Sequence, residues 1–232
     1  MPDLNNREGL LVWKFDFALS TLFEIETEAL EHLVPKGLTP MQTAPGMSLI
    51  SLTALNFPAG ALGGLPEFQE LIYGIIVPPD LSRGVPKFAH HILSLGSTCR
   101  EHLEHSAEYY MLPVSDRFTN VALGRDPHTV EFEDANGPIL SMQNIHPAPV
   151  YADADLYFQA FVEDNGDLYV ADLHMQGGLF EHQQQGDGGK LYPHPFYRGL
   201  ELEDAEPTAY LQMCSQPDRV GDQLYPRPEK FR

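Results

Sequence analysis

Two residues near the middle of the chain have the clearest capacity for chemistry, a carboxylate and an amine. Glu70 begins ELIYGIIV (70–77), a run rich in β-branched and aromatic residues that predicts a strand. If Glu70 faces a pocket it can act as an acid or base; otherwise it is an ordinary edge-strand carboxylate. Lys87, in GVPKF, can form an imine with a carbonyl compound if burial lowers its pKa. We favour a solvated lysine at the start of a strand, because Pro-Lys after a glycine turn is common in loops.

The ten histidines supply further candidates. His90 and His91 are adjacent on the strand predicted at 87–95, so they face opposite sides and one of them points inward. We take His91, together with His174 in ADLHMQG, as candidate polar groups of a cavity. His102 and His105 have i,i+3 spacing on a predicted helix, but HLEHS lacks the HExxH spacing of zinc hydrolases. A solvated helix face is therefore the favoured interpretation, and no metal site is predicted.

The elements that must position these residues are mostly strands. Alternating or apolar runs predict about nine or ten strands, and DANG (134–137) and DNGD (164–167) are strong hairpin-turn signals. Helical spacing appears only at 24–34, where Thr27 could be the cap, and at 97–110, where Ser97 could be. Twenty prolines and nineteen glycines fit this turn-rich pattern. We expect one α+β domain over 1–232, a mostly antiparallel β-barrel or strongly curved sheet with a few short flanking helices.

Composition narrows the class of partner. Thirty-three acidic residues against fourteen basic ones give a formal net charge of −19, which disfavours nucleic acid and anionic membrane surfaces. The polar start of the chain and the lack of a long apolar run predict a cytoplasmic protein. Cys99 and Cys214 form no CxxC pair, so we expect free thiols. GALGG (60–64) lacks phosphate-loop and dinucleotide spacing, no GxSxG elbow is present, and no cofactor is predicted.

Four segments together resemble the acetoacetate decarboxylase-like superfamily. They are ETEALEHLVPKGLTP (26–40), LPEFQELIYGIIVPP (65–79), CREHLEHSAEYYMLP (99–113) and DNGDLYVADLHMQG (164–177). The first is similar to the superfamily's short helix leading to a strand, and the second to its segment in which an aromatic residue and a glutamate precede a strand. The third is similar to its Arg-Glu-bearing helix, and the fourth to a late hairpin. The resemblance spans most of the chain and implies the superfamily's fold and a small carbonyl substrate.

The resemblance also bears on Lys87. The superfamily's decarboxylases use a lysine, in a Tyr-Pro-Lys-Lys sequence after the helix, to form a Schiff base with a β-keto acid. Pro86-Lys87 looks like that sequence, yet Lys87 precedes the helix at 97–110. Matching the strands in order puts the lysine's position at 108–111, and no lysine occurs between Phe88 and Gly189. The resemblance therefore implies that the Schiff-base lysine is not retained.

Other site residues follow from the same resemblance. Glu70 matches the superfamily's acidic residue, and Lys14 stands where its arginine stands and could hold a substrate carboxylate. Arg100 follows the Arg-Glu of the helix, where a structural ion pair is the alternative. Tyr109 and Tyr110 end the helix and are candidates for proton transfer and substrate contact.

Two hypotheses from different classes follow. The first is a lyase-type enzyme (a decarboxylase, dehydratase or cyclase) acting on a β-keto acid or polyketide-like carbonyl compound. It would use Glu70, a histidine and Tyr109 or Tyr110 without a covalent step, or an imine at Lys87 with Glu70 as acid/base. The second is a non-catalytic module that holds an apolar ligand or assembles through its sheet, so homo-oligomerisation is left open.

Overall fold

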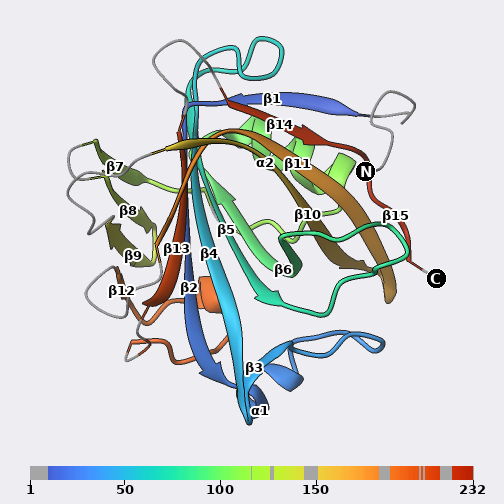
Figure 1. Cartoon of the computed structure of the whole chain (residues 1–232). Helices are drawn as coiled ribbons and strands as arrows, with labels where there is room; N and C mark the ends of the chain where they lie inside the picture. The colour runs from blue at the N-terminus through green and yellow to red at the C-terminus, as the bar shows by residue number, and fades with distance from the viewer. Residues whose placement is uncertain are drawn as a thin grey trace.

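A large curved sheet dominates the computed structural model, and a smaller sheet lies beside it (Figure 1). The structure describes residues 10–115, 117–125, 128–143, 151–182, 189–203, 205, 207–214 and 221–231. The large sheet is formed by β1 (Leu11–Phe15), β2 (Phe17–Glu26), β3 (Gln42–Ala44), β4 (Met47–Phe57), β5 (Phe68–Ile76), β6 (Phe88–Ser97), β10 (Ala152–Asp164), β11 (Asp167–His182), β13 (Pro207–Cys214), β14 (Gly221–Tyr225) and β15 (Glu229–Lys230). The smaller sheet is formed by β7 (Asn120–Arg125), β8 (His128–Asp134), β9 (Gly137–Gln143) and β12 (Gly189–Leu191). The helical elements are α1 (Thr27–Glu31), α2 (Arg100–Tyr110) and the 3-10 turn η2 (Pro195–Tyr197).

The main path of the large sheet runs β1-β14-β11-β10-β6-β5-β4-β2-β13. All of its pairings are antiparallel except that of β6 with β10. β13 also pairs with β11, so the ladder that leaves β11 through β10 and β6 returns to it through β2 and β13. The expectation of a mostly antiparallel, strongly curved sheet with short helices is confirmed.

The two predicted hairpin turns lie where the sequence indicates them. Asp164 pairs with Asp167 across a two-residue turn, in which Asn165 has φ 53° and Gly166 φ 81°. A turn with positive φ at both central positions matches the twist of the strands it joins, and Asn-Gly is the pair that adopts it most readily. Asp134 pairs with Gly137 between β8 and β9, and here the positive φ, 120°, is at Gly137 rather than at the two central residues.

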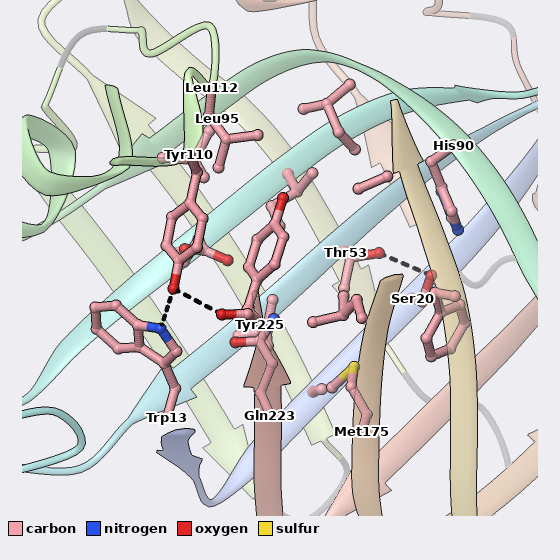
Figure 2. Close-up of a pocket in the computed structure, with 18 of the residues that line it drawn as sticks. Trp13, Ser20, Thr53, His90, Leu95, Tyr110, Leu112, Met175, Gln223 and Tyr225 are labelled. Carbon is pink, nitrogen blue, oxygen red and sulfur yellow. Dashed lines mark hydrogen bonds between the residues drawn. The ribbon is translucent and has the colours of Figure 1, made fainter. Parts of the chain in front are cut away.

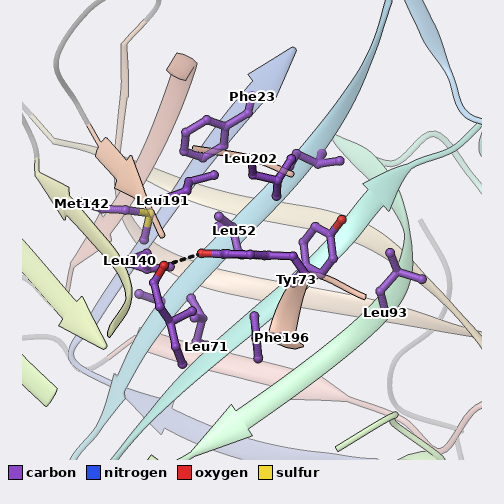
Figure 3. Close-up of a cluster of buried hydrophobic side chains, with 14 of the residues drawn as sticks. Phe23, Leu52, Leu71, Tyr73, Leu93, Leu140, Met142, Leu191, Phe196 and Leu202 are labelled. Carbon is purple, nitrogen blue, oxygen red and sulfur yellow. Dashed lines mark hydrogen bonds between the residues drawn. The ribbon is translucent and has the colours of Figure 1, made fainter. Parts of the chain in front are cut away.

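Alternation along the strands gives the large sheet two buried faces. On one face Leu71 and Tyr73 of β5 pack against Leu140 of β9 and Phe196 of η2 (Figure 3). On the other face the buried side chains pack against α2, β1 and β14, and Glu70 belongs to this second face.

Three expected boundaries are wrong. The helix expected at 24–34 is only α1, because β2 continues through Glu26. Thr27, the expected cap, lies inside the helix, and its Oγ1 is 2.9 Å from Ser48 Oγ. The strand expected at 10–19 is divided at Asp16 into β1 and β2. α2 begins at Arg100 rather than 97, because Ser97 still pairs in β6. Among the described helices, none has the length and apolarity needed to span a membrane.

Candidate functional site

A cavity of about 90 Å³ lies on the second face of the large sheet, and α2 together with β1 and β14 of the same sheet contributes to its wall (Figure 2). Strands β2, β4, β5, β6, β10 and β11 contribute side chains to its wall, and most of these are apolar. The side chains in the wall that carry a polar atom are Trp13, Ser20, Thr53, Glu70, His90, Ser106, Tyr110, Gln159, Gln223 and Tyr225. An apolar pocket with a few convergent polar groups is the usual form of a small-molecule site.

Glu70 and His102 form a buried pair at this cavity. His102 Nε2 lies 3.0 Å from Glu70 Oε2, and the two side chains are 4% and 5% exposed. Strand alternation turns Glu70 toward the cavity, whereas the next residue, Leu71, enters the opposite core. A buried carboxylate needs a hydrogen-bonding partner, and the imidazole of α2 supplies one.

The surroundings of His102 fix its ring in place. It stacks on Phe68 with ring centroids 4.5 Å apart, and it makes a T-shaped contact with Trp13 with ring centroids 5.4 Å apart. Ser106 Oγ, one helical turn later, is 3.3 Å from His102 Nε2. His102 Nδ1 is buried and has no hydrogen-bond partner among the described residues. A neutral ring that donates from Nε2 to Glu70 leaves no N–H unpaired, so this tautomer fits the geometry best.

Tyr110 ends α2 on the same side of the cavity. Its hydroxyl accepts a hydrogen bond from Trp13 Nε1 at 2.9 Å and donates one to the carbonyl oxygen of Tyr225 at 3.4 Å (Figure 2). The Tyr110 and Tyr225 rings stack 4.1 Å apart. Burial raises the pKa of Tyr110, because a buried phenolate loses its hydration. Tyr110 therefore keeps its proton at neutral pH and can donate it in a hydrogen bond.

A second polar group lies further along the cavity. Ser20 Oγ and Thr53 Oγ1 are 2.8 Å apart across β2 and β4, and both residues line the cavity. His90 also lines it, with its Nδ1 2.9 Å from Ser51 Oγ. Burial lowers the pKa of His90 to about 4, so the ring is neutral at physiological pH.

The structure brings only two of the predicted site residues, Glu70 and Tyr110, to the cavity. The two neighbouring histidines do face opposite sides, but it is His90 that lines the cavity. His91 is buried on the other side, where burial lowers its pKa to about 4. His174 also points away, between Leu173 and Met175 that line the cavity; its ring stacks on Tyr157 and its Nδ1 is 3.3 Å from Asp155.

The remaining predicted residues lie outside the cavity wall. Tyr109 stacks on His105 with ring centroids 5.1 Å apart. Lys14 forms a salt bridge with Asp222. Arg100 pairs with Glu104 at 2.9 Å in an exposed i,i+4 ion pair, which was the structural alternative for this residue.

Lys87 also lies outside the cavity. Its Nζ forms a salt bridge with Glu181, and both side chains are more than a third exposed, at 35% and 43%. The chain has five lysines, all of them within the described residues, and the cavity wall contains none of them. The other lysines are Lys14, Lys36, Lys190 and Lys230, and each is exposed.

His102 is the site residue that sequence reasoning missed. The expectation of a solvated helix face at His102 is wrong, since the residue is 3% exposed. A signal was present: the buried residues of α2 are His102, Leu103, Ser106 and Tyr110, which lie along one face of a helix. Trp13 was missed as well, and it alternates on β1 with the exposed Lys14. Among the described residues, no group of three His, Cys, Asp or Glu side chains could hold a metal ion.

Comparison with known proteins gives likeness at the level of structure. No protein-family model matches the chain, and no curated protein sequence matches it. An acetoacetate decarboxylase structure superposes with a TM-score of 0.65 at 12% identity, over 97% of this chain and 90% of that one. An acetoacetate decarboxylase-like enzyme from Sphingomonas wittichii RW1 gives 0.57 at 13% identity, over 97% and 93%. The enduracididine biosynthesis enzyme MppR, complexed with pyruvate, gives 0.56 at 8% identity, over 95% and 90%. This chain therefore has the acetoacetate decarboxylase-like fold.

Proposed function

We propose that the chain is a small-molecule enzyme that carries out lyase-type chemistry on a small carbonyl compound in this cavity, without a Schiff base. The candidate reactions are decarboxylation, dehydration and cyclisation. The observation that carries the proposal is the buried Glu70–His102 pair at the wall of an otherwise apolar cavity. Structural neighbours named as a decarboxylase and as a biosynthesis enzyme support an enzyme.

The pair suits proton transfer next to a carbonyl group. Glu70 accepts the proton of the carbon adjacent to the carbonyl, and the electron pair of that C–H bond moves toward the carbonyl oxygen. Tyr110, which keeps its proton, can donate a hydrogen bond to the developing oxyanion in place of its 3.4 Å hydrogen bond to the Tyr225 carbonyl oxygen. His102 orients Glu70 through the 3.0 Å hydrogen bond and does not itself contact the reacting carbon in this scheme.

The placement of the lysines supports a non-covalent mechanism. An imine requires a neutral amine in bonding contact with the substrate carbonyl. None of the five lysines lines the cavity, and Lys87 is held outside it in a salt bridge with Glu181. The topological argument from sequence and the structure thus support the same interpretation of Lys87.

The size of the cavity supports a small substrate. A volume of about 90 Å³ is less than the ~150 Å³ of an engineered protein cavity that admits benzene. A compound with a few carbon atoms therefore fits this cavity volume better than an extended polyketide.

The largely apolar wall also favours a second candidate function, a binding protein without chemistry. Measuring hydrogen exchange separates this candidate from an enzyme.

The test is hydrogen exchange at carbon. A panel of small ketones, aldehydes and keto acids is incubated with the protein in D₂O, and NMR follows replacement of the hydrogens adjacent to each carbonyl. We expect exchange with the wild type and its loss in Glu70→Gln. Glu31→Gln, an exposed change of the same charge, is the matched control. Ligand binding without exchange above the control rate would support the binding protein and contradict the enzyme.

A further inference from the structure

The charges at the cavity wall constrain the ligand more tightly than the fold does. Glu70 is the only carboxylate in the described wall, and no described lysine or arginine lies in it. Arginines outside the wall have other partners: Arg198 donates to the carbonyl oxygen of Leu93, Arg117 donates to that of Thr98, and Arg227 lies over the ring of Tyr109. The wall therefore offers an incoming anion no permanent positive charge.

The histidines at and beside the cavity add no permanent positive charge to its wall. His90 is neutral at physiological pH because burial lowers its pKa to about 4. The Glu70–His102 pair has no net charge when the imidazole is protonated, and a charge of −1 when it is neutral. A ligand carboxylate would thus be buried without a counter-ion and near Glu70, and burying an unpaired charge is strongly unfavourable.

The far part of the cavity carries neutral hydrogen-bonding groups. Thr53 pairs with Ile72 and Leu55 pairs with Glu70, so Thr53 lies two residues along the ladder from Glu70. At the usual rise of a strand this is roughly 7 Å. Ser20 lies beside Thr53 at 2.8 Å between hydroxyl oxygens. These hydroxyls can bind a second carbonyl, amide or hydroxyl oxygen of a ligand without demanding a charge.

We propose that the cavity selects an uncharged carbonyl compound that carries a second neutral oxygen function, and discriminates against keto acids. One carbonyl lies at Glu70 and Tyr110, and the second oxygen is bound by the Ser20–Thr53 hydroxyls. The proposal rests on the proposed function in taking this cavity as the ligand site. It narrows the chemistry as well, because an uncharged substrate has no carboxylate to lose and so leaves dehydration or cyclisation.

Isosteric probe pairs that differ in charge test the proposal. Acetoacetamide is compared with acetoacetate, and pyruvamide with pyruvate, by calorimetric titration at neutral pH. Trp13 is the only tryptophan of the chain and lines the cavity, so its fluorescence reports whether binding occurs there. We expect at least one amide to bind and quench or shift Trp13 emission, with its acid at least tenfold weaker.

Three variants locate the origin of the selectivity. Glu70→Gln, which removes the cavity's carboxylate charge, should narrow the amide-to-acid ratio at least threefold, whereas Glu31→Gln should leave it unchanged. Thr53→Val, nearly isosteric, should weaken the amide about tenfold, because the ligand's second oxygen loses its hydroxyl partner. An unchanged affinity in Thr53→Val would remove the hydroxyl contact from the proposal.

The outcomes separate this proposal from the proposed function. Acids that bind as tightly as their amides would overturn the charge selectivity, while hydrogen exchange of those acids by the wild type would leave the proposed function standing. Failure of both members of both pairs to perturb Trp13 would overturn the ligand site itself, and the proposed function with it.

Discussion

Replacing Glu70 with glutamine changes the chemistry of the cavity with little change in its shape. The carboxamide has the same size as the carboxylate and can still accept a hydrogen bond from His102 Nε2, which is 3.0 Å from Glu70 Oε2. It cannot accept a proton from carbon at neutral pH. Loss of a positioned general base lowers a rate by about 10²–10⁴, which corresponds to a transition-state free energy about 3–5 kcal/mol higher.

The stability of Glu70→Gln should change far less. A hydrogen bond to a charged group contributes about 1.5–3 kcal/mol and a neutral one about 0.5–1.5, so the free energy of unfolding falls by about 1–1.5 kcal/mol. Relief of the buried charge offsets part of even this loss. Glu70→Ala, in contrast, removes the carboxylate partner of the buried His102 Nε2 and leaves it only the 3.3 Å contact with Ser106 Oγ, which costs about 1–3 kcal/mol before any lost packing is counted.

The assay measures hydrogen exchange by NMR and unfolding in urea for both variants. The expected pattern is loss of exchange in both variants, with a larger fall in the urea midpoint in Glu70→Ala than in Glu70→Gln. A Glu70→Gln variant that exchanges carbon-bound hydrogen at the wild-type rate would refute the assignment of Glu70 as the base. Equal loss of stability in both variants would refute the claim that its role is chemical rather than structural.

Two further predictions concern regions outside the cavity. Asp172→Asn should lower the free energy of unfolding by about 3 kcal/mol in urea denaturation. The reason is that Asp172 is fully buried and Arg83 Nη2 lies 2.8 Å from its Oδ2. Asp167→Asn is the control: Asp167 is in an exposed salt bridge, and its replacement should lower the free energy of unfolding by under about 1 kcal/mol. An equal cost at the two positions would contradict this. Burial lowers the pKa of His91 in the folded chain to about 4, below the ~6.5 of an unfolded histidine. Between these two pH values the unfolded chain binds more protons than the folded chain. The free energy of unfolding therefore falls as the pH drops from ~6.5 to ~4. His91→Gln should flatten this fall by about 3 kcal/mol relative to the exposed His32→Gln, and identical pH profiles would contradict it.

Local patterns were sufficient for much of the fold. The Asn165-Gly166 turn and the alternation around β4 and β5 have physical causes within a few residues, so the sequence shows them. Glu70 could be placed at the start of a buried strand for the same reason. The parallel pairing of β6 with β10 depends on contacts between distant segments, and no local pattern specifies it.

The site itself depended on which side each residue faces. Alternation shows that His90 and His91 face opposite sides, but only the packing of the whole sheet determines which side is the cavity. His102 was misplaced because HLEHS is polar in composition. Its burial follows from the face that it shares with Leu103 and Tyr110, and a partner such as Glu70 is what allows a polar residue on that face.

The most direct measurement of the mechanism is the intact mass of the protein after borohydride is added during turnover. A carbonyl compound that undergoes hydrogen exchange with the wild type is incubated with it, borohydride is added, and the mass is compared with that of a trapped lysine-dependent decarboxylase. Because no lysine lines the cavity, we expect exchange to proceed and the mass to stay unmodified. A reduced adduct mapped to Lys87 would contradict the non-covalent mechanism and establish imine chemistry.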